Sequence, residues 1–119
     1  MKSRKTKSAT QLEREIARAL KPRVVCGECF MYAYQFVTRK GGTLKHSMVT
    51  HPWDKNDFWH AWVEKDGRVH DWQTATVRKT DPVSVGDFYL WWKPRDVKIY
   101  TADEARKQLA RAKHYGPWN

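Results

Sequence analysis

The sequence predicts a single α+β domain in which helices pack against a small antiparallel sheet. Two Thr-x-x-Glu patterns near the ends of the chain are typical of helix starts, because each side chain caps a free backbone amide. Between them, an Asp-Gly pair separates two strand-like runs, which is a strong hairpin signal. The length of 119 residues corresponds to one domain that can bury a modest core.

The N-terminal segment is expected to hold a disordered arm followed by a short helix. Residues 1–9 are basic and lack apolar periodicity, so the predicted domain covers residues 10–119. Thr10 and Glu13 form the first capping box, and Pro22 ends the helix. One apolar stripe follows at four-residue spacing: Leu12, Ile16 and Leu20.

A second helix is predicted from about Cys29 to Lys40, where Gly41-Gly42 stops it. Its apolar face consists of Phe30, Ala33, Phe36 and Val37. Residues 44–50 then alternate as a strand, and residues 52–57 form a loop. One face of that strand is expected to hold Leu44, His46, Met48 and Thr50.

The clearest local structure is the hairpin predicted around Asp66-Gly67. A two-residue type I′ turn at this pair makes the numbers of paired residues sum to 133. Trp62 then lies opposite Asp71, and His60 lies opposite Gln73. Paired residues share a face of the sheet, so His60 and Asp71 are diagonal neighbours with Cβ atoms roughly 7–8 Å apart. An imidazole–carboxylate hydrogen bond is within that reach.

After the hairpin, whose strands are expected to span residues 59–76, further strands are predicted over residues 83–92 and 97–100. The second capping box, at residues 101–104, opens a helix that continues to about Lys113. The resulting order is helix, helix, several antiparallel strands and helix, with a helix near each end of the chain.

The net charge of 23 − 13 = +10 is concentrated near the N-terminus. Residues 1–23 hold eight Lys and Arg and two Glu (+6), while residues 24–119 hold fifteen basic and eleven acidic residues (+4). A basic arm can bind an acidic partner or a nucleic acid without reading its sequence, or it can simply aid solubility. The charge therefore describes the arm and does not indicate a nucleic-acid-binding fold.

The sequence contains no segment that predicts a membrane span. No apolar run approaches the roughly 18 residues needed, and the basic N-terminus lacks the apolar stretch of a secretory signal. We therefore expect a cytoplasmic protein whose two cysteines are free thiols rather than a disulfide. Cys26 is expected to be structural, and the oligomeric state is left open.

Three residues in chain order, Cys29, His60 and Asp71, have the chemistry of a catalytic triad. A thiol attacks a carbonyl carbon as its thiolate, and the helix start predicted at Cys29 stabilises that anion. His60 can take the thiol proton and return it to the leaving group, while Asp71 orients the imidazole. Gln73 is a second candidate for orienting His60, and Trp62 is a candidate for a wall of the cleft.

These segments resemble those of the transglutaminase-like cysteine enzymes, which have a papain-like fold. Residues 27–33 are similar to the G-x-C-x-x-x-A segment around the nucleophile of that family. Residues 60–64 resemble its H-A-W-x-E strand, and residues 67–71 resemble its next strand, which ends at the triad aspartate. The resemblance covers roughly residues 24–75, which is under half of the chain.

The resemblance implies a papain-like core, with the Cys-bearing helix packed on the sheet, and thioester chemistry on a protein or peptide amide. Peptide hydrolysis, glutamine deamidation and transamidation all fit, and none needs a metal or cofactor. These enzymes often carry an oxyanion donor, Gln or Trp, upstream of the nucleophile. Here no Trp precedes Cys29, and Gln11 is the only Gln upstream. The oxyanion hole would then rely on the Cys29 amide and a further donor.

Other classes remain open from the sequence. Cys26 and Cys29 form a C-x-x-C pair, which two histidines could complete to a zinc site. The four histidines considered for it are His46, His51, His60 and His70. The alternative function is a basic module that binds nucleic acid or protein, in which the Cys/His set is structural or binds zinc. A catalytically silent version of the enzyme fold belongs to that alternative.

Overall fold

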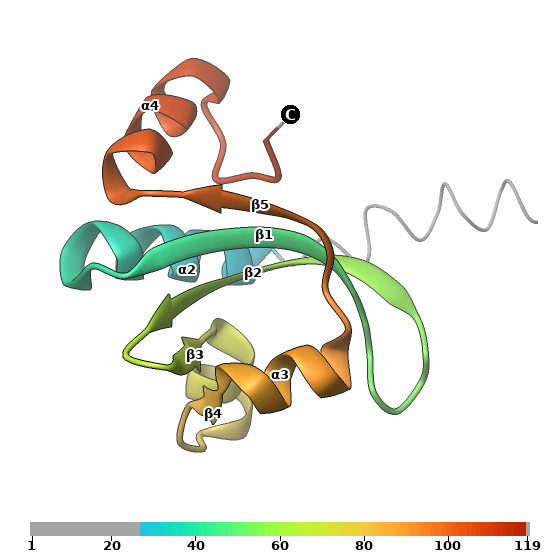
Figure 1. The fold of residues 1–119 in the computed structure, drawn as a ribbon. Helices are drawn as coiled ribbons and strands as arrows, with labels where there is room; N and C mark the ends of the chain where they lie inside the picture. Colours follow the sequence, from blue (N-terminus) through green and yellow to red (C-terminus); the bar gives the residue numbers. More distant parts are fainter. Residues whose placement is uncertain (1–26, 119) are drawn as a thin grey trace, which may run out of the picture.

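The computed structural model describes residues 27–118, and it confirms the α+β class (Figure 1). The elements in chain order are α2 (Gly27–Lys40), β1 (Thr43–Thr50), β2 (Asp57–Lys65), β3 (Arg68–His70), η1 (Gln73–Arg78), β4 (Val83–Ser84), α3 (Val85–Trp92), β5 (Arg95–Tyr100) and α4 (Ala102–Ala112). The five strands form one antiparallel sheet in the order β4-β3-β2-β1-β5. The arm and the helix expected before residue 23 lie outside the described residues.

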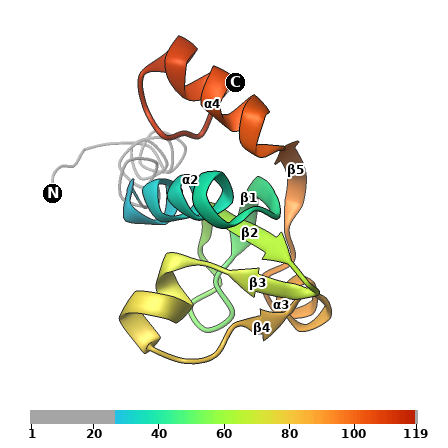
Figure 2. The same ribbon diagram turned by 90° about the vertical axis from the view of Figure 1, so that its left-hand side faces the viewer.

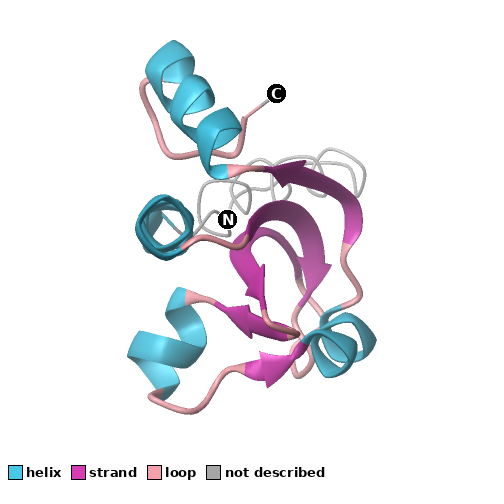
Figure 3. Ribbon diagram, turned by 60° about the vertical axis from the view of Figure 1, so that its left-hand side comes forward, coloured by secondary structure: helices cyan, strands magenta, loops and turns pink. Residues whose placement is uncertain are grey.

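Helices cover both faces of the sheet, so the domain has two apolar cores. Figures 2 and 3 show α2 between α4 and η1 on one side of the sheet, with α3 on the other side. The core under α2 and α4 contains Phe30, Ala33, Val37, Leu44, Ala61, Val63, Ala105 and Trp118. The core under α3 contains Val49, Trp62, Val69, Phe88 and Trp92.

Helix α2 follows the prediction closely, although it begins at Gly27, two residues before Cys29. Phe30, Ala33 and Val37 are buried against the sheet, as their spacing of three and four residues predicts. The helix stops at Gly41, which has a φ of +89° and whose N–H donates to the carbonyl of Val37 at 3.1 Å. That left-handed conformation favours glycine.

The predicted hairpin register is confirmed. Asp66 and Gly67 have φ values of +54° and +76°, the signs that a type I′ turn requires. The pairs Val63–His70, Glu64–Val69 and Lys65–Arg68 each sum to 133. The second strand is shorter than expected, however, because β3 ends at His70.

Two segments that we predicted as strands are helical. The strand expected to run to residue 76 gives way to η1, a π-helical segment whose Thr74 N–H donates to the Asp71 carboxylate at 3.0 Å. The strand expected over residues 83–92 is β4 followed by α3. Here the Ser84 hydroxyl caps the helix by accepting the N–H of Asp87 at 3.1 Å. In both segments a side-chain oxygen, of Asp71 or of Ser84, accepts the backbone N–H three residues later. This contact stabilises the start of a helical turn instead of a strand.

Strand β1 has buried residues on both of its faces. On the face that was expected to hold Leu44, His46, Met48 and Thr50, only the first two are buried, and Ser47 and Val49 are buried as well. Val49 packs in the core under α3, and the Ser47 hydroxyl donates to the carbonyl of Arg95 at 2.7 Å. The pairing of β1 with β5 also shifts register between His46 and Met48.

The last helix, α4, begins with the predicted capping box. The Thr101 hydroxyl accepts the Glu104 N–H at 3.1 Å, and the Thr101 N–H donates to the Glu104 carboxylate at 2.8 Å. The helix ends at Ala112, and Lys113 follows in the left-handed conformation with a φ of +62°. Strand β5, which precedes it, begins at Arg95 rather than at residue 97.

Candidate active site

His60 and Asp71 form a buried hydrogen-bonded pair on the face of the sheet that α3 covers. His60 Nε2 lies 3.0 Å from Asp71 Oδ2, and the two side chains are 0% and 3% exposed. The other carboxylate oxygen, Oδ1, accepts the backbone N–H of Thr74 at 3.0 Å. Asp71, which directly follows β3, thus forms hydrogen bonds with the start of η1 and with His60 of β2.

The environment of Asp71 favours its ionised form. Burial by itself raises the pKa of this carboxyl, but the hydrogen bond and charge of His60, together with Thr74, outweigh it and hold the pKa below its usual value. Because a carboxylate only accepts hydrogen bonds, Nε2 of His60 must be the donor. In the neutral imidazole, Nδ1 then carries the lone pair.

Nδ1 of His60 is the atom that could receive a proton. It is buried, and no group in the described part of the chain forms a hydrogen bond with it. Buried ring nitrogens normally have a partner, and both nitrogens of His46 are the other unpaired ones among the described residues. The ring itself is held by stacking on Trp92, with centroids 5.7 Å apart, and on Phe88, at 6.2 Å.

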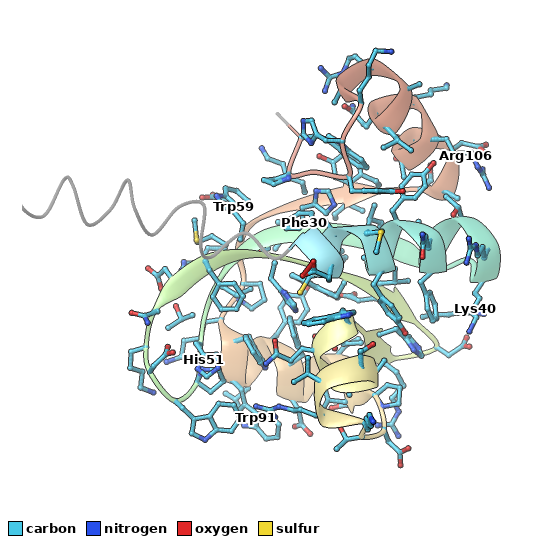
Figure 4. The ribbon with its side chains drawn as sticks, turned by 180° about the vertical axis from the view of Figure 1, so that it is seen from behind. Phe30, Lys40, His51, Trp59, Trp91 and Arg106 are labelled. Carbon is cyan, nitrogen blue, oxygen red and sulfur yellow. The ribbon has the colours of Figure 1, made fainter. Side chains whose placement is uncertain are left out.

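The short length of β3 leaves part of one edge of β2 unpaired. β3 pairs with β2 only at Val63–Lys65, so His60 pairs with Ser47 of β1 but has no partner in β3. Figure 4 shows the start of α2, marked by Phe30, close to η1 at this edge. Near this edge, Tyr32 of α2 lines one cavity with Asp71 and with Thr74 of η1, and residues of α3 stack on His60.

Cys29 is the third residue of α2, where the first backbone amides of the helix have no intrahelical acceptor. Its side chain is fully buried, and it is disulfide-bonded. The expectation of free thiols is therefore wrong for Cys29. The prediction rested on the expected cellular compartment alone. A disulfide also requires two sulfurs within bonding distance, and that depends on the fold. Cys26, the other cysteine of the sequence, lies outside the described residues.

Tyr32 connects the start of α2 with Asp71. It follows Cys29 by three residues, so the two side chains are neighbours on the helix. Tyr32 lines a small cavity of about 80 Å³ with Asp71 and Thr74. Burial and then the nearby charge of Asp71 raise the pKa of the Tyr32 hydroxyl. The turn of α2 that carries Cys29 thus lies at the same edge of the sheet as the His60–Asp71 pair.

The two secondary candidates do not have the expected positions. Gln73 begins η1 and lines a pocket beside Asp71, because β3 ends before it could lie opposite His60. Trp62 is completely buried, so its assignment as a cleft wall is wrong. Its indole Nε1 donates to Glu64 Oε2 at 3.0 Å, and its ring packs against Phe88 at 4.7 Å. The Trp and Glu of the H-A-W-x-E motif are therefore a structural pair.

A pocket beside Asp71 was missed by the sequence analysis. Its volume is about 330 Å³, and it lies between the loop after β1, η1 and α3. It is lined by Pro52, Trp53, Asp71, Gln73, Thr74, Arg78, Val83, Phe88, Trp91 and Trp92. Figure 4 shows Trp91, from α3, and His51, from the loop, at the same end of the molecule. The sequence features that could have indicated this pocket are Trp53, which lies in a polar loop, and the pair Trp91-Trp92 at the end of α3.

The histidines considered for zinc lie in separate environments. His46 packs among Phe30, Tyr100 and Trp118. The Nδ1 atom of His51 accepts the N–H groups of Trp53 and Asp54, and His70 stacks on Phe36. Within residues 27–118, no three or more His, Cys, Asp or Glu side chains are grouped so that they could hold a metal ion.

Comparison of the chain with protein-family models, with curated proteins and with solved structures found no match. Among the helices of residues 27–118, none combines the length and apolar character that crossing a bilayer requires. Function is therefore inferred from the geometry of the site.

Proposed function

We propose that the chain is a cysteine-dependent acyl-transfer enzyme that acts on amide groups of peptides or proteins. In this proposal Cys29 is the nucleophile, His60 the general base and acid, and Asp71 the group that orients His60. The observation that carries it is the buried His60–Asp71 pair, whose Nδ1 atom has no hydrogen-bond partner among the described residues. The helix on a sheet fits the papain-like, transglutaminase-like arrangement that the motifs resemble.

The active form of the enzyme requires reduction of the disulfide of Cys29. A phosphine or dithiol reductant supplies two electrons and becomes oxidised, and the disulfide takes up two protons to give two thiols. The Cys29 thiol can then transfer its proton to Nδ1 of His60. The amides of the first turn of α2 stabilise the thiolate that remains.

The chemistry that follows is a two-step acyl transfer. The thiolate attacks the amide carbon and forms a C–S bond, and His60 donates its proton to the departing nitrogen as the C–N bond breaks. Water or an amine then attacks the thioester, loses a proton to His60, and releases the thiol of Cys29. Asp71 stays ionised throughout and stabilises the imidazolium, as its lowered pKa supports.

A non-catalytic binding module is the second candidate function. It is favoured by the burial of both Cys29 and His60, each 0% exposed, and by the disulfide of Cys29. In that case the disulfide is a structural link, and the His60–Asp71 pair is a buried polar contact of the core. The two candidates differ in what reduction does to the protein.

The test is acylation of the reduced full-length chain by p-nitrophenyl acetate. With tris(2-carboxyethyl)phosphine present, we expect a burst of nitrophenol and the mass of one acetyl group on the peptide that contains Cys29. The Cys29→Ala variant and the oxidised protein should show neither. A reduced protein that folds normally but acquires no acetyl group on Cys29 would overturn the enzyme in favour of the binding module.

A further inference from the structure

We propose that the pocket beside Asp71 binds a peptide substrate through an aromatic side chain and a neighbouring carboxylate. This inference rests on the proposed function, because it assigns the substrate class of the same site. The pocket volume of about 330 Å³ lies within the range of sites that bind small ligands or single large side chains.

The walls of the pocket are aromatic. Phe88, Trp91 and Trp92 of α3 form one side, and Trp53 of the loop after β1 forms another. Trp53 is 65% exposed and Trp91 is 50% exposed, so both rings have surface that a ligand can cover. Rings that face an open pocket gain stabilisation when another aromatic ring stacks on them or meets them edge to face.

The pocket and the His60–Asp71 pair share residues. Asp71 lines the pocket directly, while Phe88 and Trp92 stack on the imidazole of His60 with interplanar angles of 22° and 12°. The rings of Phe88 and Trp92 therefore contact both the pocket and the imidazole of His60. Occupation of the pocket would place the adjacent peptide backbone next to the proposed reacting groups.

Arg78 is the pocket residue that favours an acidic peptide. Of the lining residues, Asp71 and Arg78 are charged, and both oxygens of Asp71 already accept hydrogen bonds from His60 and Thr74. Arg78 is exposed, and its guanidinium lies 4.4 Å from the ring centroid of Trp53. A guanidinium held over an aromatic ring still presents its edge N–H groups, which suit a carboxylate.

Exposed Trp rings beside an Arg also stack nucleic-acid bases, so the two ligand classes must be separated. A single-stranded nucleic acid needs an electropositive groove along its backbone. The lining of this pocket holds one cation and one anion, and its surface is otherwise apolar or neutral. The peptide therefore fits better than the nucleic acid.

The experiment measures binding to the oxidised full-length chain, in which the disulfide of Cys29 prevents acylation. The probes are the acetylated and amidated dipeptides Phe-Asp, Ala-Asp and Phe-Asn, with the Trp indole N–H signals read by NMR. We expect Phe-Asp to shift the signals of Trp53 and Trp91 and to bind about tenfold more tightly than Ala-Asp. Trp91→Ala should weaken the binding of Phe-Asp at least about fivefold.

Two further variants separate the pocket from its surroundings. Leu90→Ala is the matched control, because Leu90 is a 68% exposed neighbour of Trp91 that does not line the pocket, and it should bind as the wild type does. Arg78→Gln should abolish the preference for Phe-Asp over Phe-Asn and leave the affinity for Phe-Asn unchanged.

Equal binding of Phe-Asp and Ala-Asp, or no effect of Trp91→Ala, would overturn the proposal. So would an oligothymidylate that shifts the same indole signals and binds more tightly than Phe-Asp. These results do not depend on the chemistry of Cys29. Binding without acylation of the reduced chain would overturn only the proposed enzyme activity, and acylation without binding would overturn only the pocket assignment.

Discussion

His60 and Asp71, on neighbouring segments of the hairpin, form a buried contact of 3.0 Å between Nε2 and Oδ2. The contact follows from the pleat and from the two-residue turn, which place both side chains on the same face of the sheet. Whenever the imidazole is neutral, this contact leaves Nδ1 as its basic nitrogen. Substitutions at this pair, at Cys29 and in the surrounding fold should therefore have distinct and measurable effects.

Asp71→Asn should lower the rate of Cys29 acetylation by up to about 10⁴-fold, the loss seen when the same change is made in a serine protease triad. The amide can still accept the Thr74 N–H through Oδ1, so the start of η1 is retained, but it no longer stabilises an imidazolium. The burst rate with p-nitrophenyl acetate measures the effect. Asp103→Asn, at the surface pair with Arg106, is the control and should leave the rate unchanged. An unaffected rate in Asp71→Asn would exclude Asp71 from the triad.

After reduction, Cys29 should react with iodoacetamide at pH 6–7 far faster than Cys26. In the proposed mechanism, His60 and the first turn of α2 favour the thiolate at a pH where an ordinary thiol is protonated. Peptide mapping by mass spectrometry gives the two rates. His60→Ala should slow the reaction of Cys29, whereas His70→Ala should not, because His70 stacks on Phe36, which lies seven residues further along α2 than Cys29. Equal, slow labelling of both thiols would contradict the assignment.

His46 should make the stability of the domain dependent on pH. Burial lowers its pKa from 6.5 to about 3, and neither ring nitrogen has a hydrogen-bond partner among the described residues. The folded form stays neutral while the unfolded form takes up a proton below pH 6.5. Stability from this group is therefore complete above pH 6.5 and is lost as the pH falls towards 3.

The size of the effect is about 1.4 kcal/mol per pH unit within that window. His46→Phe, which keeps a ring against Phe30, Tyr100 and Trp118, should remove this part of the slope. Urea unfolding at a series of pH values measures it. A variant with the wild-type slope would show that His46 is not the responsible group.

Gly67→Ala should destabilise the domain by about 1–2 kcal/mol, because an alanine at the φ of +76° of the turn is strained. Gly86→Ala is the matched control. Gly86 lies within α3, and a Cβ added to it would meet no atom within 4 Å, so an alanine there should stabilise by about 0.5–1 kcal/mol. Thermal unfolding distinguishes the two signs. A loss of stability in both variants would indicate that the turn is not the cause.

Local features of the sequence were sufficient for the elements whose geometry is set by a few neighbouring residues. The Asp66-Gly67 turn, the β2–β3 register, the stop at Gly41 and the capping box at Thr101 are of this kind. Alternation alone was not sufficient for residues 72–92, where apolar residues suit a strand and a helix equally. The side chains of Asp71 and Ser84 accept backbone N–H groups of the following turns, and these contacts favour helical structure there.

The sequence by itself determined the hairpin and, through it, the meeting of His60 and Asp71, because turn conformation and pleat act over a few residues. Only the tertiary structure decided what depends on packing between distant segments. It buried Trp62 under α3, ended β3 at His70, and assembled the aromatic pocket from the loop after β1, η1 and α3. Burial and cavity shape are properties of the surfaces that come together, and no short stretch of sequence contains them.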